Sequence, residues 1–147
     1  MEKIIFIIPS LSMGGAERVI NGLFHSFKKK YDTMLVIFHG LMQFDVDGKV
    51  INLETPVGNK YNKIKNTFLR IIKLRGIFKK YKPDIIISFL GNIQPILTFY
   101  PIIVSIRTNP NGFNFWNQIL CKIIYRMNNI QKIVVPSYEL KKILIKD

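Results

Sequence analysis

Acidic residues are scarce in this sequence and unevenly placed. The 147 residues include nine Asp or Glu against 22 Lys or Arg, which gives a formal net charge of +13. Between Glu54 and Glu139 the only acid is Asp84, whereas thirteen Lys and Arg fall in the same interval. A positive field of this size favours anionic partners such as lipid headgroups, nucleic acid or phosphorylated substrates. The alternative is compositional, because Lys, Ile and Asn are abundant throughout, as in proteins of A/T-rich genomes.

Residues that bind metals are also rare. A single cysteine, Cys121, allows no internal disulfide, and its apolar helical surroundings indicate a buried, inert thiol. His25 and His39 are far from it and from each other, so they match no ligand spacing and we predict no metal and no cofactor. His39 follows a predicted strand and is the better placed of the two for catalysis, whereas His25 falls within a predicted helix.

Long apolar runs are absent. The longest candidate, Ile93 to Ile106, is interrupted by Gln94, Pro95, Pro101 and Ser105, so no segment reaches the ~18 apolar residues of a spanning helix. The apolar run Ile4–Ile8 is too short for a signal peptide. We therefore expect a cytoplasmic chain, with peripheral attachment to the inner face of the cell membrane as the alternative.

The hydrophobic pattern alternates strands with helices over one globular domain, residues 1–147. We predict strands at Ile4–Ile8, Thr33–Phe38, Lys49–Leu53, Asp84–Phe89, Ile102–Ile106 and Gln131–Val135, and helices at Ala16–Lys29, 62–81, 92–99, Phe115–Met127 and Tyr138–Ile145. Several strands are apolar on both faces, which is typical of a parallel sheet covered by helices on both sides. The predicted fold class is therefore α/β, a Rossmann-like doubly wound parallel sheet.

Ligands of such sheets bind beyond the carboxyl ends of the strands. That rule selects the segments Ser10–Gly15, His39–Leu41, Ser88–Asn92, Arg107–Gly112 and Pro136–Ser137. In the first of them, Gly14 and Gly15 precede a helix that begins near Glu17, the one acid beside a glycine turn. A glycine turn before a helix N-terminus can hold a phosphate, but the spacing matches neither the dinucleotide fingerprint nor a Walker loop. A plain tight turn is the alternative.

The segment 60–82 holds nine Lys or Arg and no acid. Ile64, Phe68, Ile71, Ile72 and Phe78 fall on one predicted stripe, which would cover the sheet and leave a basic face outside. That face could contact an anionic membrane through Lys63, Arg70, Lys73, Lys79 and Lys80, with Trp116 as a further interfacial anchor. An ordinary solvated helix face is the alternative. We expect no nucleic-acid partner, because no RNA- or DNA-recognition signature is present.

Four segments together resemble the N-terminal domain of glycosyltransferase family 4 enzymes, which have the two-domain GT-B fold. They are IPSLSMGGAERVI at 8–20, KPDIIISF at 82–89, IVSIRTNP at 103–110 and IVVPSYELKKIL at 133–144. The resemblance covers nearly the whole chain in the expected order. It implies an acceptor-binding domain whose partner domain binds a nucleotide sugar, and transfer with retention of configuration without a metal.

The resemblance also implies roles for individual residues. Gly14, Gly15 and Glu17 would line the cleft between the two domains, near the donor phosphates. Arg107 and Asn109 would contact a phosphate or sugar hydroxyls of a lipid-linked or surface-polysaccharide acceptor. Ser137 would lie in the cleft after the last strand.

The resemblance stops at Asp147, before any donor-binding domain. We therefore expect this chain alone to be a catalytically incomplete half, whether as a fragment, a remnant or one part of a split enzyme with a separate C-terminal subunit. A second hypothesis is a non-catalytic binding or regulatory module that pairs with a transferase subunit. A third is a free-standing nucleotide-binding protein.

Overall fold

The computed structural model describes residues 1–12, 14–40, 46–55, 60–90, 93–107 and 123–145. Six strands form one sheet in the order β3-β2-β1-β4-β5-β6, and every neighbouring pair is parallel. The strands are β1 Lys3–Ile8, β2 Asp32–Ile37, β3 Lys49–Asn52, β4 Ile85–Phe89, β5 Ile102–Ser105 and β6 Ile130–Val134. This order is that of a doubly wound sheet, whose direction of winding reverses between β1 and β4. The predicted fold class is confirmed.

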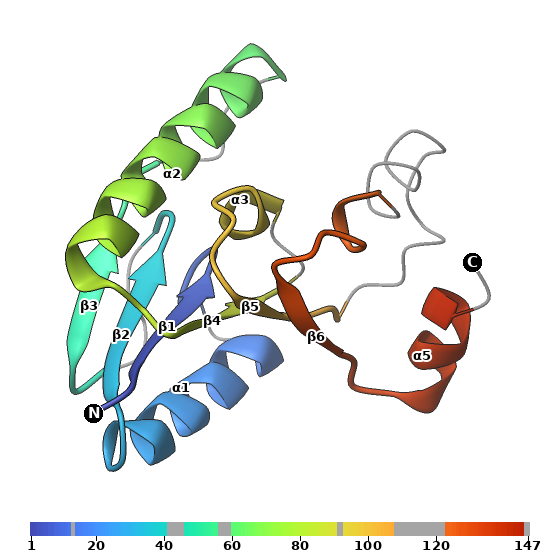
Figure 1. Cartoon of the computed structure of the whole chain (residues 1–147), viewed down its shortest axis with the longest axis horizontal. Coiled ribbons are helices and arrows are strands. Elements are labelled where there is room, and N and C mark those ends of the chain that lie inside the picture. Colours follow the sequence, from blue (N-terminus) through green and yellow to red (C-terminus); the bar gives the residue numbers. More distant parts are fainter. Residues whose placement is uncertain (13, 41–45, 56–59, 91–92, 108–122, 146–147) are drawn as a thin grey trace.

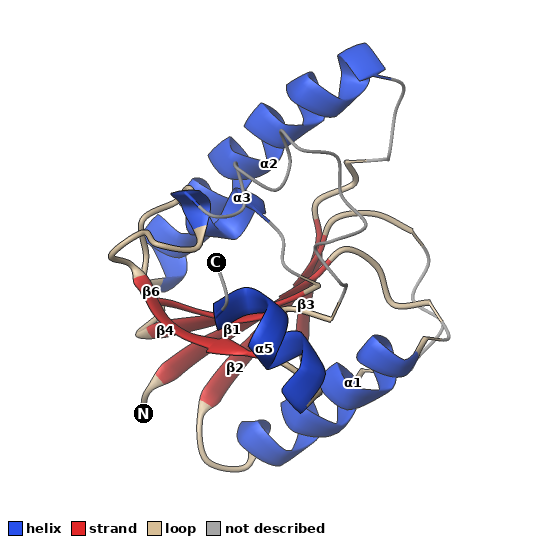
Figure 2. Ribbon diagram, turned by 90° about the vertical axis from the view of Figure 1, so that its right-hand side faces the viewer, coloured by secondary structure: helices blue, strands red, loops and turns tan. Residues whose placement is uncertain are grey.

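Helices lie on both faces of the sheet. α1 (Gly15–Lys28) covers one face, whereas α2 (Lys60–Tyr81) and α3 (Ile93–Ile96) cover the other (Figures 1 and 2). The last helix, α5, spans Tyr138–Ile145. Parallel strands joined by crossover helices explain why β1 is buried along almost its whole length.

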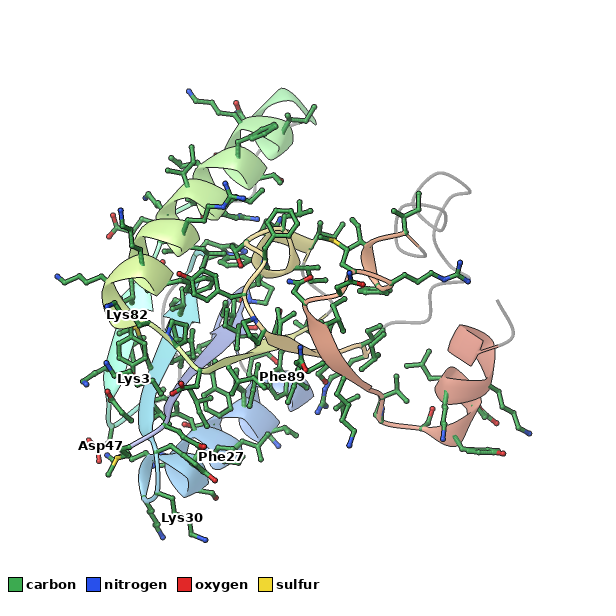
Figure 3. All side chains as sticks on the ribbon, viewed as in Figure 1. Lys3, Phe27, Lys30, Asp47, Lys82 and Phe89 are labelled. Carbon is green, nitrogen blue, oxygen red and sulfur yellow. The ribbon has the colours of Figure 1, made fainter. Side chains whose placement is uncertain are left out.

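The side chains form one apolar cluster on each face of the sheet (Figure 3). Beneath α1, the ring of Phe6 packs edge-on against Phe24 and Phe27, with ring centres 5.9 and 5.6 Å apart. Beneath α2, Leu74 and Phe78 pack on the central strands. Complete burial of one Leu or Phe side chain contributes about 1.5–3 kcal/mol to the free energy of unfolding. The two clusters therefore hold the strands in place, and with them the loops at the strand ends.

The predicted elements agree with the observed ones to within a few residues at most ends. The short helix predicted at 92–99 is confined to Ile93–Ile96, because the Thr98 hydroxyl donates to the Pro95 carbonyl and Phe99 adopts a positive φ of 66°. Most of the helix predicted at Phe115–Met127, with Trp116 and Cys121, lies outside the described residues.

The stripe predicted to pack α2 on the sheet is wrong for three of its five residues. Phe78 is buried, but Ile64, Phe68 and Ile72 are exposed, and Leu74 takes the buried position instead. The reason is length. A helix of 22 residues is about 33 Å long, whereas strands of four to six residues span about 13–20 Å. The first turns of α2 therefore project beyond the sheet (Figure 1).

Candidate functional site

The candidate site lies where the winding of the sheet reverses, beyond the carboxyl ends of β1 and β4. In doubly wound sheets the crossovers diverge at this point, so a crevice is left between the loops. The register pairs Ile7 of β1 with Ser88 of β4, so the two strands end at the same level. The loop after β1 contains the Gly14 turn, which the sequence had singled out.

The Gly14 turn is built around the carboxylate of Glu17. Glu17 lies in the first turn of α1 and is only 8% exposed, and its Oε1 accepts a hydrogen bond of 3.0 Å from the Ser12 hydroxyl. A Cβ added at Gly14 would lie 2.2 Å from Glu17 Oε2. Since Gly14 is in the extended region, with φ −97°, its backbone does not require glycine, but any side chain here would force the Glu17 carboxylate to move.

Gly15 differs from its neighbour, because a Cβ added there would meet nothing within 4 Å. The N-cap residue of α1 is Gly14, which has no side chain to cap the helix. A carboxylate near a helix N-terminus is favourable because it interacts with the positive end of the helix dipole. Glu17 thus fills the space beside Gly14, and the open side of the turn is at Gly15.

Two polar atoms at the ends of β4 and β5 are buried without a partner in the described part of the structure. They are the Ser88 hydroxyl and Nε of Arg107. The Arg107 guanidinium also lies over the Phe89 ring, 5.5 Å from its centre, and Phe89 belongs to the cluster beneath α1 (Figure 3). Leaving a buried donor unpaired costs about 1–3 kcal/mol, so Nε of Arg107, which lies beyond the strand end, is suited to a polar ligand. Ser88 is fully buried within β4 and alternates with Phe89, so its hydroxyl points to the other face of the sheet.

A second polar group lies at the ends of β2 and β3. Arg70 of α2 donates from Nε to the Thr55 hydroxyl at 2.9 Å and from a terminal nitrogen to the Thr55 carbonyl at 2.7 Å. Its guanidinium also stacks on Phe38, 4.8 Å from the ring centre. Burial, reinforced by the charge of Arg70, lowers the pKa of His39. His39 is therefore neutral near pH 7 and can accept a hydrogen bond.

The residues predicted to face a membrane divide into two groups. Arg70 and Lys73 are engaged on the sheet side, because Lys73 donates to the Leu53 carbonyl at 2.6 Å. Lys79 and Lys80 are exposed near the end of α2. The side chain of Lys63 lies outside what the structure describes.

Of the remaining predicted site residues, Ser137 lies just after β6, and Asn109 lies outside the described residues. The Ser137 hydroxyl accepts a hydrogen bond of 3.2 Å from the Leu140 amide and so caps α5, a structural role for a residue predicted to line the cleft. Thr55 was not predicted as a site residue, because no sequence motif indicates that it accepts two hydrogen bonds from Arg70.

Among the residues that the structure describes, no three His, Cys, Asp or Glu side chains gather as a metal-binding group. Within those same ranges, no helix is both long enough and apolar enough to span a bilayer. Arg107, just after β5, and the Gly14 turn, just after β1, lie at the same carboxyl edge of the sheet, and a guanidinium in such a position can bind an anionic or hydroxylated ligand.

Comparison with known proteins gives one sequence relative and several structural ones. The chain is 36% identical over 119 residues to the GalNAc-α-(1→4)-GalNAc-α-(1→3)-diNAcBac-PP-undecaprenol α-1,4-N-acetyl-D-galactosaminyltransferase of Campylobacter jejuni. The match covers 74% of this chain and 33% of the relative, so the chain spans about a third of that protein's length. No protein-family model matches the chain.

Two solved structures share the fold. The lipopolysaccharide outer core galactosyltransferase WaaB, in its apo form, superposes with a TM-score of 0.71 at 17% identity, over 98% of this chain and 42% of WaaB. A Listeria monocytogenes protein assigned as a UDP-N-acetylglucosamine 2-epimerase superposes with a TM-score of 0.63 at 12% identity, over 98% of this chain and 41% of that protein. At these identities the likeness is one of fold alone.

Proposed function

Because the chain is a glycosyltransferase-like domain of the GT-B type, we propose that it is the acceptor-binding half of a retaining transferase of family 4. The transferase would move a sugar from a nucleotide sugar to a lipid-linked or surface-polysaccharide acceptor. The observation that carries this proposal is the 36% identity to a transferase whose named acceptor is a glycan on PP-undecaprenol. The chemistry at the strand ends supports it.

Arg107 is the residue we assign to the acceptor. Its Nε is buried and unpaired among the described residues, and its guanidinium is held over the Phe89 ring. A guanidinium binds phosphate oxygens through two parallel hydrogen bonds, and its position here is fixed by stacking. The diphosphate of a lipid-linked glycan, or the hydroxyls of its sugars, would accept the hydrogen bond that Nε of Arg107 can donate.

The Gly14 turn is the part that we assign to the cleft between two domains. Glu17 fixes the loop through Ser12, and the exposed backbone at Gly15 leaves the helix N-terminus accessible. The donor phosphates would approach on the Gly15 side, where the helix dipole favours an anion. A second domain would bind the nucleotide itself, so we propose that these 147 residues alone do not catalyse transfer.

The acceptor would bring the domain to the cytoplasmic face of a membrane. A lipid-linked glycan stays in the bilayer, and a chain with net charge +13 is attracted to anionic headgroups. We propose no metal, no further cofactor and no nucleic-acid partner.

Calorimetric titration with farnesyl diphosphate, a water-soluble polyprenyl diphosphate, tests the assignment. We expect saturable binding, and we expect Arg107→Gln to weaken it at least tenfold, because a hydrogen bond to a charged group contributes about 1.5–3 kcal/mol. Lys132→Gln on β6, which removes one exposed positive charge, is the matched control and should leave the affinity nearly unchanged. Absence of binding, or equal losses in both variants, would contradict the role given to Arg107.

A further inference from the structure

A hollow lies at the edge of the sheet opposite to the candidate site. Its volume is about 640 Å³, and its walls are formed by Phe99, Pro101, Met127, Asn128, Asn129 and Gln131. These residues come just before β5, just before β6 or at the start of β6, so the hollow lies at the amino ends of these strands. Arg107 and the Gly14 turn follow the carboxyl ends of their strands. A ligand in the hollow would therefore be remote from the candidate site.

Phe99 presents an exposed aromatic ring at the hollow, although its backbone conformation is unfavourable for Phe. It follows α3 with a positive φ of 66°, a conformation that usually belongs to glycine at the end of a helix. Any other side chain costs free energy there, and the ring recovers little of it by burial, because Phe99 is 63% exposed. The Arg75 guanidinium lies over the ring, 5.9 Å from its centre. An exposed ring at a strained backbone position points to a binding role.

Asn129 joins the two segments between which the hollow lies. Its Nδ2 donates to the Ile96 carbonyl at 2.9 Å and to the Tyr100 carbonyl at 3.1 Å, and its own carbonyl accepts from the Ile102 amide at 2.9 Å. These bonds hold the loop before β5 against the turn before β6 (Figure 1). Since both Nδ2 protons are used, Oδ1 is the free group, and it is buried without a partner among the described residues. Such an acceptor is suited to a hydroxyl or amide donor of a ligand.

The walls of the hollow are polar in part but carry no charge. Asn128 and Gln131 are exposed, and the amide of each can both donate and accept hydrogen bonds. Pro101 and Met127 supply apolar surface. None of the six wall residues is charged, in a chain whose net charge is +13. An aromatic ring, apolar surface and a few amides suit a neutral ligand with one apolar face and several hydroxyls, which is the chemistry of a sugar ring.

We propose that this hollow is a second carbohydrate-binding site, which takes a neutral glycan. One sugar ring would lie on Phe99, because the negative face of an aromatic ring attracts the C–H groups on the face of a sugar. The sugar hydroxyls would pair with the amides of Asn128 and Gln131. A nucleobase also stacks on aromatic rings, but a nucleotide brings phosphates, and these walls offer no cation to bind them. The site goes beyond the proposed function, because a glycan held there is remote from Arg107.

NMR titration of the ¹⁵N-labelled 147-residue chain tests the site. The ligands are two neutral disaccharides, N,N′-diacetylchitobiose and maltose, with adenosine as the competing nucleobase. We expect at least one disaccharide to shift the signals of Phe99, Asn128 and Gln131 saturably, with a Kd on the order of 1 mM. Phe99→Ala should weaken this binding at least tenfold, because it removes the stacking surface. Asn128→Ala and Gln131→Ala should each weaken it about two- to tenfold, the range of one net hydrogen bond.

Phe68→Ala is the matched control for Phe99→Ala. Phe68 lies on α2, is not a wall residue of the hollow, and is exposed by the same fraction, 63%. This control should bind the disaccharide as the original chain does. Phe99→Gly separates binding from folding, because glycine adopts a positive φ without strain. It should unfold at the same temperature as the original chain or a higher one, and still lose the disaccharide.

Absence of saturable binding by both disaccharides would overturn the proposal. Shifts confined to Arg107 and the Gly14 turn, or equal affinity in Phe99→Ala and Phe68→Ala, would overturn it as well. Preferential binding of adenosine in the hollow would show that the ring receives a nucleobase, and the assignment to a glycan would be wrong. The farnesyl diphosphate titration measures binding at Arg107, at the other edge of the sheet, so this site and the proposed function can fail separately.

Discussion

Replacement of Gly14 by alanine should destabilise the domain, whereas the same replacement at Gly15 should not. The two positions are adjacent and both lie at the start of α1, but their surroundings differ. At Gly14 a Cβ would lie 2.2 Å from Glu17 Oε2 and 2.9 Å from Cδ, whereas at Gly15 it would meet nothing within 4 Å. The Glu17 carboxylate must move by about 1 Å to reach an ordinary contact distance of ~3.3 Å.

The magnitude follows from what that movement breaks. Glu17 is buried, and its hydrogen bond with Ser12 involves a charged acceptor, which is worth about 1.5–3 kcal/mol. Alanine recovers about 0.4–1 kcal/mol because it restricts the unfolded chain. The expected net cost of Gly14→Ala is therefore about 1–2 kcal/mol, whereas Gly15→Ala should stabilise the domain by about 0.4–1 kcal/mol.

Urea unfolding of both variants measures the difference. A double-mutant cycle with Glu17→Ala identifies its cause, because residues in contact are not additive. With Glu17 removed, Gly14→Ala should cost nothing or stabilise slightly, which corresponds to a coupling of about 2 kcal/mol. If Gly14→Ala costs the same with and without Glu17, or behaves like Gly15→Ala, the account of this turn is refuted.

Two further predictions concern the ends of β2 and β3. Arg70→Met should lower the free energy of unfolding by about 1–3 kcal/mol, because the Thr55 carbonyl and hydroxyl lose a charged donor. The control Lys80→Met, on the exposed side of α2, should change it by no more than about 0.5 kcal/mol. Similar losses in both variants would contradict the contacts assigned to Arg70. Burial lowers the pKa of His39, so as the pH falls below about 6.5 the unfolded chain binds a proton at His39 before the folded protein does. The free energy of unfolding therefore falls with pH, by at most about 1.4 kcal/mol per pH unit, until the folded protein is protonated as well. His39→Gln should remove that contribution from unfolding curves recorded between pH 7.5 and 5, and an unchanged slope would show that His39 titrates normally.

Most of the fold could be predicted from the sequence, because its hydrophobic pattern is strong. Apolar runs of strand length at Ile4–Ile8 and Asp84–Phe89, separated by helical spacing, are compatible with few architectures other than a parallel sheet with helices on both faces. The Gly14 turn could be located as well, because sheet topology sends every ligand-binding loop to the carboxyl ends of the strands.

The packing of α2 could not be predicted in the same way. Helical periodicity groups Ile64, Phe68 and Ile72 with Phe78, but it says nothing of where the sheet ends, and the sheet is shorter than the helix. The engagement of Arg70 and Lys73 was also hidden, because their acceptors include backbone carbonyls at Thr55 and Leu53. Every residue has a carbonyl, so such partners leave no trace in the sequence.

The contacts inside the site could not be predicted for a similar reason. The sequence locates the Gly14 turn, but it does not indicate that the carboxylate of Glu17, three positions along the chain, lies against Gly14. The Arg107 guanidinium lies over Phe89, a contact between two strand ends that no local pattern encodes, and its Nε has no hydrogen-bond partner among the described residues.

Sugar transfer by a chimera tests most directly whether this domain is the acceptor half of a glycosyltransferase. The chain would be joined to the part of the Campylobacter jejuni transferase that the similarity does not cover, and incubated with a labelled nucleotide sugar and an undecaprenyl-diphosphate-linked glycan. The account predicts that the folded chimera transfers sugar to the lipid-linked glycan, that Arg107→Gln reduces this transfer at least tenfold, and that the 147-residue chain alone transfers none. A folded chimera that binds the lipid-linked glycan but transfers nothing, or one whose transfer is indifferent to Arg107, would contradict the assignment of this domain as the acceptor half.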